Sequence, residues 1–310
     1  MALPEAGAFP EWWPPAAVER AFEPTSGRPD VEMLPMPTWR WGPAEFAAVT
    51  ARAEAATVPT AVYLRFDSWD DPARAWRGDP GFTSLVHRLA EAVTVVAGPQ
   101  LPVRGGPAHP VALPYPPLVP RRRRPPDLAG ARRDVHFAGF WLEGGWAAAP
   151  SDTRDRHHRG RLLASLRGAL PPDRVAFRRD AYWELDEAEQ ARLRRRSLRE
   201  MDDATIVFAP AGYGYLTIRH ADGWARGRVV LSEDVSRHAL VPEPRRWADG
   251  EIALLYEPSG ADLAEVVVEA VARPDRLAAI ARAGWEYGRR WTRPEVQAAL
   301  LAEALAEHLA

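Results

Sequence analysis

Short apolar segments that alternate with helical patterns run through the second half of the chain, and this alternation limits the fold more than any other feature. VHFAGFW (135–141) and ATIVFAP (204–210) are apolar throughout, whereas helical patterns lie near 159–167 and over 186–200. Short strands in which apolar and polar residues do not alternate are typical of a parallel sheet that helices cover on both faces. The sequence therefore predicts a Rossmann-like second half. Its other expected elements are strands at RVAF (174–177), RVVLS and IALLYE, and helices from about Leu216 and from Asp262 onward.

The first half has a weaker version of the same alternation. The order is a helix at PAEFAAVTARAEA, a strand at TAVYLRF, a helix at GFTSLVHRLAEA and a strand at VTVVAG. Residues 1–34, rich in Pro and Trp, have no periodicity and are expected to be irregular. Pro clusters and charge between about 115 and 132 predict a linker, which divides the chain into a smaller domain at 1–128 and a larger one at 129–310. Two Rossmann-like domains, with the ligand in the cleft between them, describe the GT-B architecture.

The amino-acid composition excludes several enzyme classes. The sequence has no Cys and no Lys, so each of its 40 basic residues is Arg. Thiolate chemistry is therefore excluded, as are a P-loop lysine, a protein-kinase strand lysine and a pyridoxal phosphate Schiff base.

Charge and hydropathy indicate the compartment and partners. The net charge of −2 speaks against nucleic acid as the main partner. The first residues lack a signal-peptide pattern, and no apolar run reaches the roughly 20 residues that a membrane helix needs. We expect a cytoplasmic protein without a membrane span; the sequence does not indicate its oligomeric state.

The loop after ATIVFAP is the strongest candidate for a binding site, because ligands of parallel sheets bind beyond the carboxyl ends of the strands. Gly212 and Gly214 allow a close backbone approach, Thr217 can cap the next helix, and the helix N-terminus favours an anion. Arg219 and Asp222 share one face of that helix. The guanidinium suits a diphosphate and the carboxylate suits a ribose diol. The alternative is an Arg219–Asp222 ion pair beside a plain glycine turn.

The segment SLREMDDATIVFAPAGYGYLTIRHADGWARGRVVLSED resembles the nucleotide-sugar-binding motif of exostosin-like glycosyltransferases, glycosyltransferase family 47 and its GT-B relatives. VHFAGFW followed by SDTRDRHHRGRLLASL is similar to another block of that family. Two departures concern the site: Asp222 stands where the family has Glu, and the family's Gly-Gly-Arg-Asp-His signature is absent from the first half. The residues in register with the motif are Pro210, Gly212, Thr217, Arg219, Asp222, Gly227 and Val229 to Leu231.

The resemblance implies a hexosyltransferase-type enzyme with a UDP-linked sugar donor, an unknown acceptor and neither a metal nor another cofactor. Arg219 would contact the diphosphate and Asp222 the ribose or sugar hydroxyls. An Arg in the helix after VHFAGF would add a second phosphate contact, and both Arg154 and Arg161 fit that position. The nucleotide-sugar-binding residues so implied are Gly212, Tyr213, Gly214, Thr217, Arg219, Asp222, Arg154 and Arg161.

For the chemical step, Arg219 would stabilise the leaving diphosphate, and an inverting transfer would also need a base for the acceptor proton. Asp67 and Asp70 follow the strand TAVYLRF, while Glu143 and His136 lie beside or within VHFAGFW. For each of the four, an ordinary loop carboxylate or a hydrogen-bonded histidine is the simpler interpretation. Two rival functions remain open: a non-catalytic nucleotide- or sugar-binding protein, and an unrelated doubly wound phosphatase or phosphorylase acting on sugar phosphates.

Three further groups are interpreted structurally. Arg121 to Arg124 are flanked by prolines and are expected to form a solvated linker. His157 and His158 are adjacent without a third ligand nearby, which predicts a surface position. The 13 Trp residues are expected chiefly in the core and at the domain interface, with stacking on sugar rings as the alternative.

Overall fold

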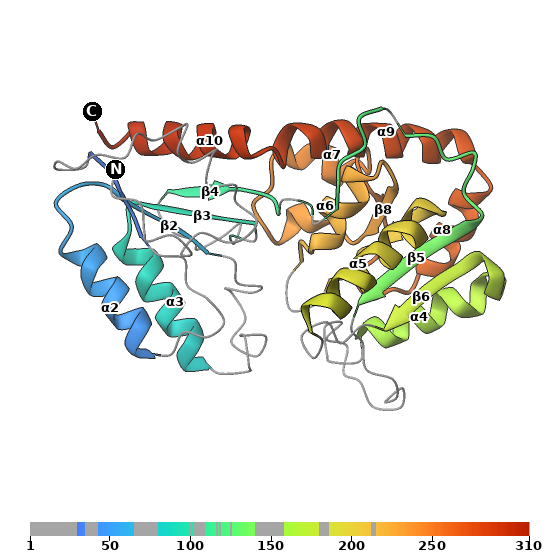
Figure 1. Cartoon of the computed structure of the whole chain (residues 1–310), viewed down its shortest axis with the longest axis horizontal. Helices are drawn as coiled ribbons and strands as arrows, with labels where there is room; N and C mark the ends of the chain where they lie inside the picture. Colours follow the sequence, from blue (N-terminus) through green and yellow to red (C-terminus); the bar gives the residue numbers. More distant parts are fainter. Residues whose placement is uncertain are drawn as a thin grey trace.

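The chain forms two lobes, each built on a parallel β-sheet (Figure 1). The computed structural model describes residues 30–34, 43–64, 80–99, 101, 109–115, 117, 119–124, 126–139, 158–179, 186–211 and 215–309. We call the part with the sheet β1–β4 the first lobe and the part with the sheet β5–β9 the second lobe.

The sheet of the first lobe has the order β1-β2-β3-β4, and all of its neighbours are parallel. Phe46 of helix α2 and Leu89 of helix α3 pack with Val62 and Val96 on one face of the sheet. The expectation that residues 1–34 are irregular is wrong at one place, because β1 lies within them and pairs with β2. The elements are β1 (Glu32–Met33), α2 (Pro43–Glu54), β2 (Thr60–Tyr63), α3 (Pro80–Ala92), β3 (Val95–Gly98) and β4 (Pro110–Ala112).

The second lobe has a five-stranded parallel sheet with the order β6-β5-β7-β8-β9. The predicted Rossmann-like alternation of strands and helices is therefore confirmed. Its elements are β5 (Arg133–Gly139), α4 (His158–Ala169), η3 (Pro172–Arg174), β6 (Val175–Arg179), α5 (Glu187–Asp202), β7 (Ala204–Phe208), α6 (Ile218–Ala225), β8 (Val229–Ser232), η5 (Val235–Arg237), α7 (Pro244–Ala248), β9 (Leu254–Leu255), α8 (Leu263–Val271), α9 (Pro274–Trp291) and α10 (Pro294–Ala306).

Two apolar clusters cover the faces of this sheet. Phe137 and Phe208 pack, with ring centroids 6.0 Å apart, in the cluster shared with α4 and α8. The other cluster contains the buried rings of Trp224, Trp247 and Tyr287, and the Nε1 of Trp224 donates to the carbonyl of Ile252 at 3.0 Å. Burial is therefore the fate of Trp224 and Trp247, as expected, whereas Trp12, Trp13, Trp39, Trp41, Trp141 and Trp146 lie outside the described residues.

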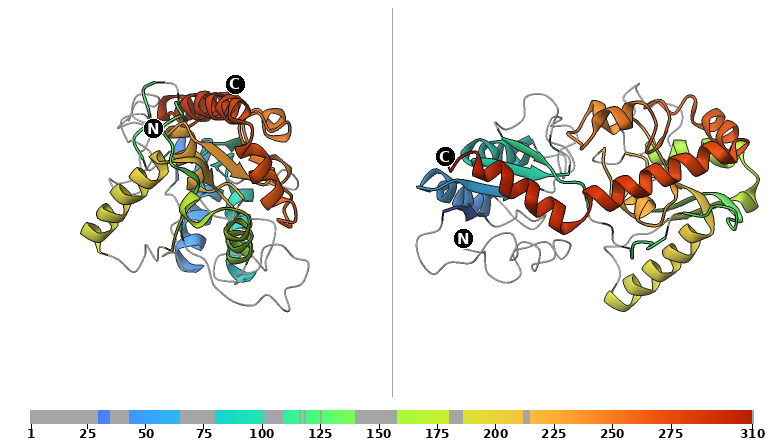
Figure 2. Two further views of the ribbon diagram at one scale, coloured as in Figure 1. Left: turned by 90° about the vertical axis from the view of Figure 1, so that its right-hand side faces the viewer. Right: turned by 90° about the horizontal axis from the view of Figure 1, so that it is seen from above.

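The helices α9 and α10 run along both lobes, and α10 packs on the first sheet (Figure 2). Leu301 and Leu305 of α10 are buried there, so the end of the chain completes the core of the first lobe. A second contact joins the lobes at Leu240. Its side chain packs on the core of the first lobe, and its backbone N–H donates to the carbonyl of Leu101 at 2.8 Å. The division at 128/129 stays a prediction.

The arginine run is only partly the solvated linker that we expected. Arg121 is half-buried and donates to the carbonyl of Thr292 and, at 3.0 Å, to its Oγ1. Arg123 and Arg124 are exposed. The half-buried guanidinium satisfies the carbonyl at the end of α9, which explains why this part of the linker lies on the second lobe.

Candidate functional site

The strand order of the second lobe places a topological switch between β5 and β7. The chain continues from β5 to β6 on one side and then crosses to β7 on the other. In open parallel sheets such a switch, at the carboxyl ends of the strands, is the usual place for a ligand. The N-terminus of α6 follows β7 at this edge, and Thr217 is its N-cap residue, as predicted. The helix itself begins at Ile218, two residues later than expected.

Arg219 reaches from the first turn of α6 to the carboxyl end of β5. Its Nε donates to the carbonyl of Ala138, and its guanidinium lies 5.9 Å from the ring centroid of Phe137. A Cβ added to Gly139 would come within 2.9 Å of Nη2. The side chain is half-buried, so a positive charge is held at the switch point rather than in bulk water.

Asp222 lies one turn further along α6 and is 7% exposed. It is therefore more deeply buried than Arg219. The alternative of an Arg219–Asp222 ion pair stays open.

A second arginine reaches the loop after β7. Arg159, in the first turn of α4, donates from Nε to the carbonyl of Ala211 at 3.2 Å. Arg161 is half-buried on the same helix, and Arg154 lies outside the described residues. Arg159 was not predicted, because the helix after β5 begins with several arginines and sequence spacing does not distinguish among them.

His220 is the buried group that joins α6 to β8. Its side chain is 0% exposed; the backbone N–H of Thr217 donates to Nδ1 at 3.0 Å, and Nε2 lies 2.8 Å from the Oγ of Ser232. Burial lowers the pKa of His220 to about 3, so the ring is neutral. This residue was also missed, although a polar residue three positions after a Thr N-cap is the pattern of a capping box.

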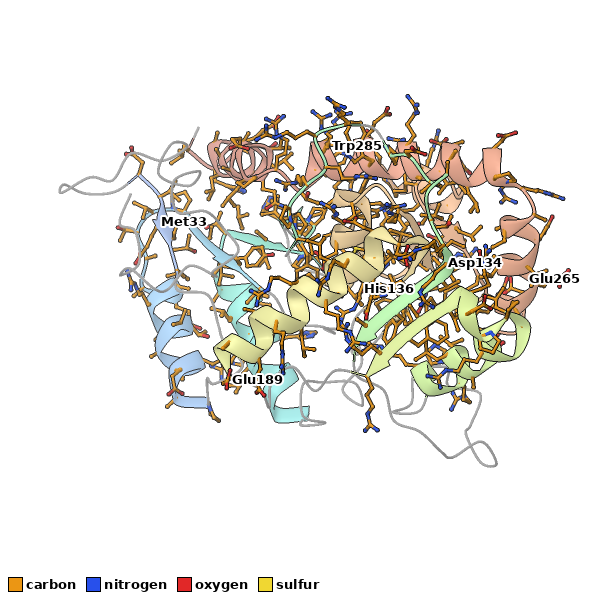
Figure 3. All side chains as sticks on the ribbon, turned by 45° about the vertical axis from the view of Figure 1, so that its right-hand side comes forward. Met33, Asp134, His136, Glu189, Glu265 and Trp285 are labelled. Carbon is orange, nitrogen blue, oxygen red and sulfur yellow. The ribbon has the colours of Figure 1, made fainter. Side chains whose placement is uncertain are left out.

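His136 is a poor candidate for a catalytic base. It lies on β5 (Figure 3), is 1% exposed, and neither ring nitrogen has a hydrogen-bond partner among the described residues. Burial, and then the charges of Arg178 and Arg219, lower its pKa to about 3. A general base works best with a pKa near the working pH, which this imidazole lacks.

Several predicted site residues fall where the structure gives no description. These are Asp67, Asp70, Glu143, Arg154, Gly212, Tyr213 and Gly214, all outside the described residues. Of the predicted set, the structure brings Thr217, Arg219 and Asp222 together on α6 and places Arg161 on α4.

Two groups beyond β8 extend the polar edge of the sheet. Glu233 follows β8 directly and is fully buried, and Asp234 accepts from the N–H of Ser236 at 3.1 Å. The rings of Tyr215 and His238 stack with centroids 4.2 Å apart, which ties the loop after β7 to the loop after β8. None of these four side chains was predicted from the sequence.

The prediction of a surface position for the histidine pair is wrong for His158. This residue opens α4 and is buried, because the helix start packs toward the lobe interior; His157 is outside the described residues. Within the described part of the chain, no three His, Asp or Glu side chains are grouped as metal ligands, and no helix is long and apolar enough to cross a membrane.

The sequence matches no protein-family model and no curated protein. Solved structures are similar in fold. HepE from Anabaena, in complex with UDP and glucose, superposes over 90% of this chain and 78% of its own, with a TM-score of 0.53 and 12% identity. A second HepE structure, with UDP, covers 94% and 81% at the same TM-score and identity. The pneumococcal O-GlcNAc transferase GtfA, in complex with UDP and GlcNAc, covers 85% of this chain and 55% of its own, with a TM-score of 0.48 and 10% identity.

The likeness to the two HepE structures and the two parallel sheets show that the chain has the GT-B fold. At 12% identity the likeness to HepE is one of fold.

Proposed function

We propose that the protein is a glycosyltransferase that transfers a sugar from a UDP-linked donor to an acceptor. The observation that carries the proposal is the guanidinium of Arg219, which is held beside the N-terminus of α6 at the switch point of a GT-B fold. A helix N-terminus and a fixed cation together favour a diphosphate. HepE, which has this fold, was solved with UDP bound, and that supports the choice of nucleotide.

The proposed chemistry depends on charge stabilisation. When the sugar leaves, its anomeric carbon becomes oxocarbenium-like and the diphosphate gains negative charge. Arg219 would contact that diphosphate, and Arg159, which lies against the loop after β7, would supply a second cation. Fixed guanidinium groups lower the barrier because they need no reorganisation as the charge develops. We propose that the transfer needs no metal.

The remaining roles are proposals of the same kind. Asp222 would accept hydrogen bonds from ribose or sugar hydroxyls, and Gly212, Tyr213 and Gly214 would give the nucleotide a close backbone approach. Asp67 or Glu143 would take the acceptor proton. We place the protein in the cytoplasm, with an exostosin-like, hexosyl-transferring activity as the most specific assignment.

The test is nucleotide-induced stabilisation in Arg219→Ala. A charge-assisted hydrogen bond contributes about 1.5–3 kcal/mol, so loss of the guanidinium should weaken UDP binding by a factor of about 10 to 100. The melting temperature without ligand should fall by only a few degrees, because the variant loses one hydrogen bond to Ala138, of about 1.5–3 kcal/mol, from a half-buried side chain. Wild-type protein should in addition hydrolyse a UDP-sugar slowly when no acceptor is present.

The matched control is Arg192→Ala on α5, which removes an exposed arginine far from α6 in the sequence and should keep UDP stabilisation intact. If Arg219→Ala binds UDP as well as the wild type does, the proposed diphosphate contact is wrong. A large loss of stability without ligand would instead favour the Arg219–Asp222 ion pair.

A non-catalytic nucleotide-binding protein is the second candidate. The observation in its favour is that His136, the one proposed base among the described residues, is buried and weakly basic. Stabilisation by UDP without turnover of any UDP-sugar, with a panel of sugar and peptide acceptors, would select this candidate.

A further inference from the structure

We propose that His220 is a positioning residue for the donor site: its imidazole fixes the first turn of α6 to the end of β8 and thereby aims Arg219 at β5. The proposal rests on the proposed function, because the ligand whose affinity it governs is a nucleoside diphosphate. His220 itself is not placed in contact with that ligand.

The hydrogen bonds of the ring join two elements of the lobe. Nδ1 lies 3.0 Å from the backbone nitrogen and 3.1 Å from the carbonyl oxygen of Thr217, and Nε2 lies 2.8 Å from the Oγ of Ser232. In a neutral ring one nitrogen donates and the other accepts, and the serine hydroxyl can do either, so both tautomers pair with Thr217 and with Ser232. The imidazole therefore bridges the residue before α6 and the last residue of β8.

The surroundings prevent the ring from adopting another arrangement. The side chain is fully buried, and the ring centroids of Trp224 and Trp247 lie 6.0 and 5.7 Å from its own. Interiors are close-packed, so a rotated imidazole would collide with these rings and leave two buried polar groups without partners. The bridge is thus rigid, and the low pKa keeps it neutral over the physiological range.

The consequence for Arg219 follows from helix geometry. Consecutive residues of an α-helix point about 100° apart, so His220 and Arg219 leave the same turn in different directions. His220 points to Ser232 on β8, whereas Arg219 reaches Ala138 on β5. Fixing one of the two directions fixes the other, and a guanidinium that is already in place loses less conformational entropy when the ligand binds.

A purely structural role is the competing explanation, since buried hydrogen bonds and a helix cap also contribute to stability. The two roles differ in what they predict for affinity. A positioning role makes UDP affinity fall in variants that remain folded, while a structural role changes the free energy of unfolding alone.

The experiment measures UDP affinity by calorimetry, at a temperature where all variants are folded. Ser232→Ala removes the hydroxyl that pairs with Nε2, and it should weaken UDP binding about fivefold, which corresponds to one net hydrogen bond. His220→Leu removes both bonds and should weaken binding tenfold or more. His220→Gln, whose amide offers an acceptor and a donor, should recover most of the affinity.

Val267→Ala is the matched control. It truncates a fully buried residue of α8 in the cluster on the other face of the sheet, so it costs stability without touching α6. Its UDP affinity should equal that of the wild type. Nitrogen NMR of the wild type should show a neutral His220 ring.

The outcomes separate the two proposals. If the wild type binds UDP and the folded variants Ser232→Ala and His220→Leu bind it equally well, the positioning role is wrong and the proposed function stands. A His220→Leu protein that does not fold leaves Ser232→Ala to decide. If the wild type binds no nucleoside diphosphate, the proposed function fails and this inference fails with it.

Discussion

Two buried neutral histidines make the stability of this protein sensitive to mild acid. His136 and His220 both have a pKa of about 3 in the folded chain, chiefly because of burial. In the unfolded chain the value returns to roughly 6.5. As the pH falls below 6.5, the unfolded state therefore takes up protons that the folded state cannot, and the free energy of unfolding decreases until the pH approaches 3.

The magnitude follows from the size of the shift. Each pH unit below 6.5 costs about 1.4 kcal/mol per histidine, so at pH 5 each contributes a loss of about 2 kcal/mol. The two together lower the free energy of unfolding by about 4 kcal/mol, against a typical total of about 5–15 kcal/mol. Acid sensitivity should therefore be measurable well above the pH at which carboxylates titrate.

The assay is urea unfolding followed by tryptophan fluorescence between pH 8 and pH 5. His136→Leu and His220→Gln each remove one titrating ring, and each should reduce the loss between these pH values by about 2 kcal/mol, while the double variant should lose little. Each variant is compared with itself at the two pH values, so the part of the stability loss that does not depend on pH cancels. If all four proteins lose equal stability between pH 8 and pH 5, the burial argument for both histidines is refuted.

Two further predictions concern packing. Gly139→Ala places a Cβ 2.9 Å from Nη2 of Arg219, so the guanidinium must move; UDP affinity should fall about tenfold. Gly168→Ala, whose added Cβ meets nothing within 4 Å, should leave that affinity unchanged in the same calorimetric titration. Leu240→Ala removes the second-lobe side chain that packs on the first-lobe core and should cost about 2 kcal/mol in urea unfolding, whereas Leu309→Ala, which is exposed, should cost less than about 0.5 kcal/mol. Equal effects of Leu240→Ala and Leu309→Ala would contradict the proposed contact between the lobes.

The alternation of strands and helices was predictable because each element has its own local pattern. VHFAGFW and ATIVFAP are apolar over their length, and β5 and β7 lie within one or two residues of the expected bounds. β1 was not predictable: a strand of two residues has no periodicity, and its parallel pairing with β2 joins residues 28 positions apart, as in Glu32 with Thr60. The return of α10 to the first lobe has no local signal either, because it depends on which sheet its Leu301 and Leu305 meet.

The site was predictable where one short segment contains it. The N-cap at Thr217 and the arginine beside it follow from the order of strand, glycines and helix. The partners of these residues were not predictable, since Arg219 meets Ala138, 81 positions away, and His220 meets Ser232, 12 positions away, only in the folded sheet. Sequence spacing gave no reason to prefer Arg159 over its neighbours, because only the folded structure brings its Nε to the carbonyl of Ala211.

The position of Arg219 gives an independent reason to expect an anion at this edge. A cation in the first turn of a helix is opposed by the helix dipole, at a cost of about 0.3–1 kcal/mol. The carbonyl of Ala138 and the face of Phe137 offset part of this cost. An arginine whose side chain extended into solvent, away from the helix N-terminus, would not bear the cost at all. A negatively charged ligand would remove the conflict, because it is attracted by both the guanidinium and the helix N-terminus. Local rules are broken most often at functional sites, and here the broken rule lies at the switch point of the sheet.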